Sequence, residues 1–253
     1  YYTLFLVKNQ PFVVTEPFNK YAQMLRSREG LAGAGEWLTL KKMLPDFAGK
    51  TVLDLGCGYG WHCIHAAEQG AAEVVGVDIS ERMLAVAGAK TKQQNVRYIR
   101  TAMEDAEFPA GSFDIVLSSL AVHYIEDLHA LFRRVNGFLK EGGAFVFSAE
   151  HPVYTACANA DFIRSASGDP LCYPVDNYFY EGKRNCVFLG EPVVKYHRTL
   201  TSYFRALTES GFAVRDIAEP MPPESMRGLE EMRNEMRRPM MILFSSVKVR
   251  DAQ

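Results

Sequence analysis

The chain has 253 residues, of which 48% are hydrophobic and 23% charged, a composition typical of globular proteins that excludes wholesale disorder. Lys and Arg (28) nearly balance Asp and Glu (30), so no overall positive field is present to attract nucleic acid or an anionic membrane. No apolar run approaches the ~20 residues needed to cross a bilayer.

The N-terminal stretch and the cysteines bear on location. Residues 1–7 are apolar but lack the basic flank and the small-residue cleavage site of an export signal. The five cysteines are odd in number and scattered over a chain large enough to fold without disulfides. We therefore expect a cytoplasmic protein with reduced thiols and no membrane association.

From residue 50 onward, strand and helix patterns alternate, which is typical of a parallel sheet with crossover helices. Short apolar runs predict strands at 51–55, 73–78, 96–100, 113–119 and 144–147. Helical periodicity and capping signals predict helices at 61–69, from 81 onward, and at 126–139. The fold class predicted from this alternation is α/β.

After residue 150 the rhythm changes. Residues 151–195 show no sustained period and form a longer stretch than a simple connection needs, which favours an insertion that covers a substrate. A helix at 199–210 and strands at 212–217 and 240–249 follow. Between these last strands, the balanced charges of residues 224–238 favour a solvated helix face over a nucleic-acid site.

The richest motif is Val-Leu-Asp-Leu-Gly-Cys-Gly-Tyr-Gly at 52–60, a strand that ends in three alternating glycines and leads into a helix. Gly56, Gly58 and Gly60 permit a tight turn and the close approach of a ligand to backbone N–H groups. The spacing G-x-G-x-G differs from the G-x-G-x-x-G of dinucleotide sites. Asp54 would crowd a pyrophosphate there but suits a cationic ligand.

A second acidic residue, Asp78, ends the next strand, 18 residues after Gly60 (78 − 60), where a carboxylate can accept hydrogen bonds from ribose hydroxyls. Together, Asp54, the glycine turn and Asp78 resemble a class I S-adenosylmethionine-dependent methyltransferase. The resemblance extends over about residues 50–150.

The resemblance implies a Rossmann-like, doubly wound, mostly parallel seven-stranded sheet with helices on both faces and the last strand antiparallel. It divides the chain into N-terminal cap helices (1–45) and a cofactor-binding domain (46–253) with its insertion at 151–195. It also implies S-adenosyl-L-methionine as the cofactor and S-adenosyl-L-homocysteine as the product. Residues 19–37 are similar to the cap helices of small-molecule methyltransferases.

The resemblance also suggests which other residues hold the cofactor. Around the glycine turn, Cys57 would offer its backbone, and after the second strand Ile79 and Met83 would flank Asp78. Many relatives carry an acidic residue where this chain has Ala102, so the adenine contact is assigned to the residues that follow. For the adenine, the resemblance implies Met103, Glu104 and Asp105. For the methionine end it implies Tyr21 and Arg26, with Arg26 pairing with the cofactor carboxylate. For the transfer site it implies Ser118, Ser119 and Leu120.

Three histidines are candidates for a general base. His123 follows the fourth strand at its carboxyl end, where open α/β sheets place ligands, although a capping or core role is equally compatible. His151 and His197 could reach the same mouth. By contrast, His62, Cys63 and His65 do not share one helix face, so no metal site is predicted.

The function predicted is transfer of a methyl group to an oxygen, nitrogen or carbon nucleophile of a small molecule. Nucleic-acid methylation is disfavoured because 118–121 reads Ser-Ser-Leu-Ala rather than Asn/Asp-Pro-Pro-aromatic, and because the charge is balanced. Two alternatives remain: an NAD(P)-dependent oxidoreductase, and a protein that binds the cofactor without catalysis. The pattern does not indicate the acceptor or the oligomeric state.

Overall fold

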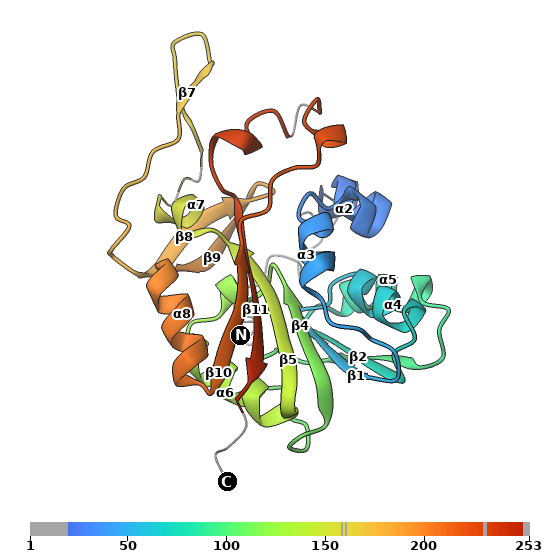
Figure 1. The fold of residues 1–253 in the computed structure, drawn as a ribbon. Helices are drawn as coiled ribbons and strands as arrows, with labels where there is room; N and C mark the ends of the chain where they lie inside the picture. The colour runs from blue at the N-terminus through green and yellow to red at the C-terminus, as the bar shows by residue number, and fades with distance from the viewer. Residues whose placement is uncertain (1–19, 158, 160, 230–231, 250–253) are drawn as a thin grey trace, which may run out of the picture.

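The computed structural model describes residues 20–157, 159, 161–229 and 232–249 (Figure 1). The apolar stretch at 1–7, the first part of the predicted cap up to residue 19, and residues 230–231 of the predicted charged helix lie outside the described residues. Within them, no helix is long and apolar enough to cross a membrane.

A seven-stranded sheet forms the centre of the fold, with the order β10-β11-β5-β4-β1-β2-β3. Its strands are β1 (Thr51–Leu55), β2 (Glu73–Asp78), β3 (Val96–Arg100), β4 (Phe113–Ser119), β5 (Leu139–Glu150), β10 (Phe212–Ala218) and β11 (Met241–Lys248). The strands β3, β2, β1, β4 and β5, in this order across the sheet, pair in parallel with their neighbours. β11 pairs antiparallel with both β5 and β10. This confirms the predicted doubly wound sheet with its last strand antiparallel.

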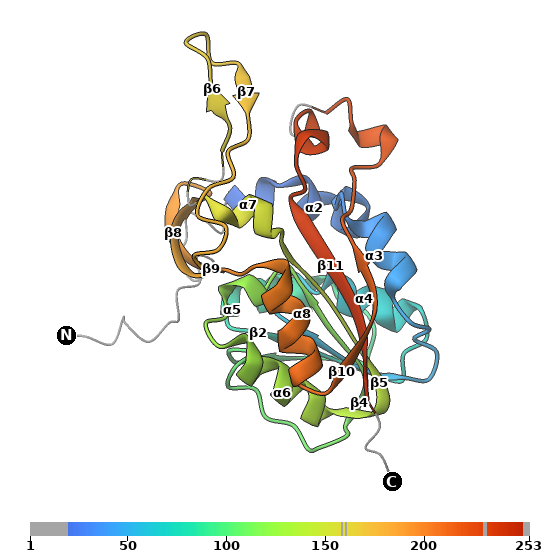
Figure 2. The same cartoon turned by 60° about the vertical axis from the view of Figure 1, so that its left-hand side comes forward.

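Helices cover both faces of the sheet (Figures 1 and 2). On one face lie α3 (Trp37–Met43), α4 (Trp61–Glu68) and α5 (Glu81–Lys90), which pack on strands through residues such as Leu40, Ala66 and Leu84. On the other face lie α6 (Leu128–Phe138) and α8 (Leu200–Glu209). The apolar periodicity of each helix places one stripe on the strands and leaves the opposite side to solvent.

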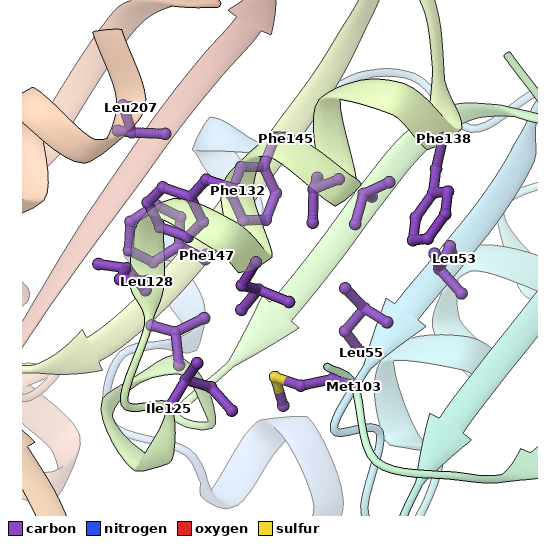
Figure 3. Packing of buried hydrophobic residues seen from close by; sticks show 14 of the residues in the cluster. Leu53, Leu55, Met103, Ile125, Leu128, Phe132, Phe138, Phe145, Phe147 and Leu207 are labelled. Atoms are coloured by element: carbon purple, nitrogen blue, oxygen red, sulfur yellow. The ribbon is translucent and has the colours of Figure 1, made fainter. Parts of the chain in front are cut away.

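The face under α6 and α8 is rich in aromatic rings (Figure 3). Phe132 from α6 contacts Phe145 and Phe147 from β5, with ring centroids 5.2 and 5.1 Å apart. Phe147 stacks in turn on Phe244 of β11 at 5.0 Å. Aromatic pairs at this spacing add stabilisation beyond the area they bury, so this cluster joins the antiparallel edge to the parallel part of the sheet.

The carboxyl edge of the parallel strands is covered by segments from three parts of the chain (Figures 1 and 2). The first comes from the N-terminal part: residues 20–23 are helical, and α2 (Leu25–Glu29) and a 3₁₀ turn, η3 (Gly30–Gly33), lead into α3. The second is the stretch between β5 and α8, and the third is the connection between β10 and β11, residues 219–240, which we call the covering segment.

The stretch after β5 is more regular than its sequence indicates. Instead of an irregular insertion at 151–195, it contains α7 (Pro152–Ala156) and two antiparallel hairpins, β6–β7 (Ile163–Arg164 with Pro170–Cys172) and β8–β9 (Gly182–Phe188 with Glu191–His197). The hairpins escaped prediction because their strands carry exposed apolar residues such as Leu171 and Val187, which removes the alternation expected of a half-buried strand. β5 is also longer than predicted, since Gly142 and Gly143 lie within the strand and do not end it.

The predicted solvated helix at 224–238 is wrong for the described part of that segment, which forms two 3₁₀ turns, η5 (Glu224–Met226) and η7 (Glu235–Arg237). One ion pair of this segment is also less exposed than expected. Arg238 has a side chain only 8% exposed, pairs with Glu235 at 3.0 Å, and lies over the rings of Tyr154 and Tyr173 at 4.8 and 5.1 Å. An amphipathic helix would be held by a continuous apolar face. This segment is instead held at one point, by the stacking of Arg238 on aromatic rings.

A pair of glycines gives a direct test of the packing. A Cβ on Gly76 of β2 would lie 2.6 Å from Tyr98 Cδ1 and 2.9 Å from Cys57 Sγ, whereas a Cβ on Gly88 of α5 would meet nothing within 4 Å. We expect Gly76→Ala to lower the free energy of unfolding by about 1–3 kcal/mol through overpacking. Gly88→Ala should raise it by about 0.5–1 kcal/mol because alanine favours the helix. Urea denaturation measures both; equal effects of the two substitutions would contradict this account.

Candidate functional site

The glycine turn after β1 has a backbone that only glycine adopts readily. Gly56, Gly58 and Gly60 have φ angles of 75°, 52° and 74°. A Cβ on Gly56 would lie 2.6 Å from Ala121 Cβ, and one on Gly60 would lie 2.2 Å from the Tyr98 hydroxyl. A Cβ on Gly58 would meet no protein atom within 4 Å. The turn is therefore packed against the protein at Gly56 and Gly60 and open at Gly58, where a ligand can approach.

Asp78 closes one side of this opening. It is the last residue of β2, and its Oδ2 accepts a hydrogen bond from the Gly58 N–H at 2.9 Å while Oδ1 accepts one from the Ser80 N–H at 2.8 Å. Burial raises the pKa of Asp78, and these two N–H donors oppose that rise. The carboxylate is thus fixed against the glycine turn, with lone pairs left for a ligand.

Asp54 lies under the turn and does not reach the open side. It is 1% exposed; its Oδ2 accepts a bond from the Cys63 thiol at 3.3 Å, and its Oδ1 has no partner among the described residues. Burial raises the pKa of Asp54 to about 7, against the effect of the Cys63 bond. Cys57 is buried as well, in a core cluster, and burial raises the pKa of its thiol to about 11, as expected of a side chain that packs and does not react.

A cleft of about 1130 Å³, open to solvent, lies over the carboxyl edge of the sheet. The structure brings together along its walls most of the residues proposed from sequence: Tyr21, Arg26, Gly56, Gly58, Asp78, Ile79, Met83, Met103, Glu104, Ser119, Leu120 and His123. Those that do not line it are Asp54, Cys57, Gly60, Asp105, Ser118, His151 and His197. The cleft continues into a second hollow between α2 and the covering segment, since Met24 and Met240 line both.

At the end of the cleft nearest β3, the lining comes from the loop after that strand. Thr101, Ala102, Met103 and Glu104 all contribute. Met103 is only 6% exposed; it packs with the core residues shown in Figure 3 and also lines the cleft. This end is therefore a firm apolar wall with one acidic side chain beside it, an arrangement that suits a flat base with an exocyclic amine.

The N-terminal segment forms the opposite wall. The Tyr21 ring meets the Tyr59 ring edge-on at 5.4 Å, and burial raises the pKa of Tyr21. Arg26 forms an ion pair with the buried Glu36, whose second carboxylate oxygen has no hydrogen-bond partner among the described residues. Arg26 therefore reaches the cleft already paired with Glu36, and the sequence alone does not predict this partner.

Beyond the glycine turn, the floor of the cleft is formed by the end of β4. Leu120 has a φ of 52°, unusual for a residue with a side chain, and its N–H donates to the backbone oxygen and the hydroxyl of Ser148, both at 3.0 Å. Ser118 instead donates to the Leu55 carbonyl at 2.8 Å and is buried. Strained backbone held by such contacts is concentrated at functional sites.

The three histidine candidates separate clearly. His123, in the 3₁₀ turn η4 (Val122–Tyr124), lines the cleft. His151 caps α7 through a bond from the Val153 N–H at 3.0 Å, and its Nε2 lies 2.7 Å from Glu219. His197 has both ring nitrogens engaged, by Thr155 at 2.7 Å and by the Tyr178 carbonyl at 2.9 Å.

Several lining residues were missed by sequence reasoning. Glu150 ends β5 and could have been found, because the carboxyl ends of parallel strands share one edge. Met240 and Met241 could also have been found, since an antiparallel strand begins at that same edge. Phe188 could not, because it reaches the cleft from a hairpin with no clear periodicity. The lining residues outside the stretches that the resemblance indicated, 101–109 and 118–124, are Met24, Val77, Glu150, Phe188, Met240 and Met241; within those stretches, Thr101, Ala102, Ala121 and Tyr124 were not named as candidates.

Comparison with known proteins agrees with this geometry. Residues 53–147 match the model of the methyltransferase domain family. An S-adenosylmethionine-dependent methyltransferase from Mesorhizobium loti is 43% identical with a TM-score of 0.80, over 87% of this chain and all of that one. A protein from Listeria monocytogenes, provisionally described as an enzyme of the same kind, is 50% identical with a TM-score of 0.83 over the same shares. A Haemophilus influenzae protein of no assigned function is 33% identical over 83% of this chain and 86% of its own.

The protein is therefore an enzyme of the Rossmann-like methyltransferase class. The chain belongs to the S-adenosylmethionine-dependent methyltransferases, and its cofactor is S-adenosylmethionine. The site fits this cofactor on its own geometry, because the space above Gly58 is open and the Asp78 carboxylate is fixed beside it. A cationic, ribose-containing ligand is complementary to both features.

The buried Asp54 makes stability depend on pH. Its folded-state pKa of about 7 lies above the usual 3.8, so the folded chain binds the proton more tightly, and wild-type stability falls as the pH rises from about 4 through 7. Asp54→Asn removes this loss. We expect the variant to gain roughly 1–4 kcal/mol relative to wild type between pH 5 and pH 8 without ligand.

Urea denaturation at the two pH values measures the effect. Asp216→Asn, at an exposed position of β10, is the matched control and should show no such gain. An unchanged difference between Asp54→Asn and wild type across the pH range would show that Asp54 is ionised in the folded protein at pH 5.

Proposed function

We propose that the protein transfers the methyl group of S-adenosylmethionine to a small molecule bound in the same cleft. One observation carries the proposal: a single cleft runs from the glycine turn and Asp78 to a second group of polar residues, His123 and Glu150, at the ends of β4 and β5. Cofactor and acceptor can therefore lie end to end in one space, as in-line displacement requires.

In this proposal the cofactor lies across the carboxyl ends of β1 to β4. Asp78 accepts hydrogen bonds from the ribose hydroxyls, and the backbone of Gly56 and Gly58 supports the methionine part. Met103 packs against the adenine while Glu104 accepts from its exocyclic amine. Asp105, Gly60, Cys57, Ser118 and Asp54 act from behind this wall, since none of them lines the cleft.

The methionine end faces the N-terminal segment, where Arg26 would meet the cofactor carboxylate and Tyr21 would close over it. Because Arg26 is already paired with Glu36, its guanidinium is held in place before the ligand arrives. On this basis we propose that residues 1–45 act as a cap on a cofactor-binding domain formed by 46–253.

S-adenosylmethionine supplies an activated methyl group with its own leaving group, so the chain needs to provide alignment, exclusion of water and, where required, a place for a proton. Leu120 and Ser119 form the floor next to the transfer point. The hairpin β8–β9, through Phe188, and the covering segment, through Met240, shield it. A covered cleft favours a small-molecule acceptor over a polymer.

The charge of the chain supports the same class of acceptor, because a net charge of −2 provides no overall positive field to attract nucleic acid. The five cysteines are all free thiols in the structure, which supports the proposed cytoplasmic location. His151 and His197, which the sequence also offered as bases, hold α7 and the stretch around it in this proposal and take no part in transfer.

Calorimetric titration tests the cofactor site. S-adenosylmethionine and S-adenosylhomocysteine should bind wild-type protein, and Asp78→Ala should weaken both by ~10-fold to 1000-fold through the loss of hydrogen bonds to a charged group. Glu73→Gln is the control: it lies on the same strand, at the exposed opposite end, and should bind normally.

NAD(H) titrated in parallel distinguishes the oxidoreductase alternative. Binding of NAD(H) in place of the adenosyl ligands would overturn the proposal. Binding of S-adenosylmethionine with no transfer to any acceptor would favour the non-catalytic alternative.

A further inference from the structure

His123 and Glu150 meet at the end of the cleft beyond Leu120. They come from different strand ends, and the Glu150 N–H donates to His123 Nδ1 at 3.4 Å, which joins the two residues. Both side chains line the cleft. Both are therefore placed where they can touch an acceptor next to the transfer point.

The bond from Glu150 decides which ring nitrogen of His123 carries the proton. Since Nδ1 accepts a hydrogen bond, it has no proton, and in a neutral ring the proton is on Nε2. Burial lowers the pKa of His123 to about 4, so the ring is neutral at physiological pH. Nε2 has no partner in the described part of the chain and is not one of the fully buried unpaired atoms, so it keeps some exposure, and the residue that carries it lines the cleft.

Glu150 offers the complementary group. Its Oε1 is held by Lys195 of β9 at 2.5 Å, in a pair whose side chains are only 13% and 6% exposed, and the Lys195 ammonium lies 5.0 Å from the centre of the Phe188 ring. The lysine fixes the carboxylate and balances its charge. The other oxygen, Oε2, has no partner among the described residues and, like the His123 Nε2, is not a fully buried unpaired atom, so it keeps some exposure in a residue that lines the cleft.

We propose that the methyl acceptor is a hydroxyl group, which donates its hydrogen bond to Glu150 and accepts one from the Nε2–H of His123. This inference rests on the proposed function and specifies its acceptor. A hydroxyl oxygen has two lone pairs, one for His123 and one for the methyl group. A neutral amine has a single lone pair, and a donor at His123 would occupy the pair that must attack.

The step balances within these groups. The O–C bond forms as the S–C bond of the cofactor breaks, and the sulfur keeps the electron pair, which gives S-adenosylhomocysteine. The hydroxyl proton passes to Glu150 and from there to solvent. His123 keeps its proton throughout, so it positions the acceptor as a donor and does not serve as the base that its place in the sequence suggested.

The charges of the cleft also limit the acceptor. Among the described residues that line this cleft the one Lys or Arg is Arg26, whose charge is balanced by Glu36; Lys20 lines the second hollow and not this cleft. No spare cation is therefore present on these walls for a phosphate group. The acceptor inferred is an uncharged hydroxyl compound whose apolar body lies against Phe188 and Met240.

Isotope-labelled cofactor locates the transferred methyl group even while the acceptor is unidentified. The protein is incubated with [methyl-¹³C]S-adenosylmethionine and a deproteinised metabolite extract of bacterial cells, and ¹H–¹³C correlation spectra are recorded. A new signal in the methoxy region is expected. A new N-methyl or C-methyl signal would overturn the hydroxyl assignment and leave the methyltransferase function standing. No methylated product from protein that binds the cofactor would overturn both.

Variants separate a donor from a base. His123→Gln keeps an N–H donor and should retain activity within ~10-fold, whereas His123→Leu should lose ~100-fold or more. Glu150→Gln should lower kcat ~100-fold or more. Each should bind S-adenosylhomocysteine within about twofold of wild type.

The matched control is Glu141→Gln, an exposed position at the other end of β5, which should behave as wild type. Equal loss in His123→Gln and His123→Leu would contradict the donor role.

The tautomer can be measured without turnover. In ¹⁵N-histidine-labelled protein bound to S-adenosylhomocysteine, the signals missing from His123→Gln belong to His123. We expect an unprotonated Nδ1 and a protonated Nε2 that do not titrate between pH 6 and 8. A proton on Nδ1, or titration in that range, would overturn the proposal even if the product were a methyl ether.

Discussion

The structure depends on a short stretch of backbone that leaves no room for side chains below it. Between β1 and α4 the chain passes directly over Ala121 and the Tyr98 hydroxyl, and each of its three glycines has a positive φ. A methyl group at Gly56 would collide with Ala121, and one at Gly60 with Tyr98, so the turn can pack this closely only because these positions are glycine. Its open side, the position of Asp78 and the start of α4 all follow from this contact.

The ends of successive strands then supply the cleft with its chemical groups in spatial order. The loop after β3 gives Met103 and Glu104, β2 gives Asp78, and β4 and β5 give His123 and Glu150. The acidic groups that face the cleft are thus spread along it, while Asp54 is kept under the turn, where burial raises its pKa to about 7. In the proposed function, this sheet order places the groups for the cofactor and the groups for the acceptor along one edge of the sheet.

The sequence was a reliable guide wherever a residue's role follows from its place on a strand. The strand ends at Asp78 and Ser119 and the turn at 56–60 were predicted because burial gives strands a clear pattern and glycine a distinct role. Phe188 and Arg238 could not be predicted, since they act through contacts between segments distant in sequence. The pairing of Arg26 with Glu36 and the orientation of the His123 ring likewise depend on neighbours that local patterns do not reveal.

Arg238 is held by Glu235 and stacked on Tyr154 and Tyr173, and Arg237 donates to the carbonyl oxygens of Pro170 and Leu171 in the hairpin β6–β7. Two parts of the chain far apart in sequence are therefore fastened together above the cleft. A hairpin too short to present the carbonyl oxygens of Pro170 and Leu171 would leave Arg237 without these two acceptors, and the covering segment would lose its attachment at this point.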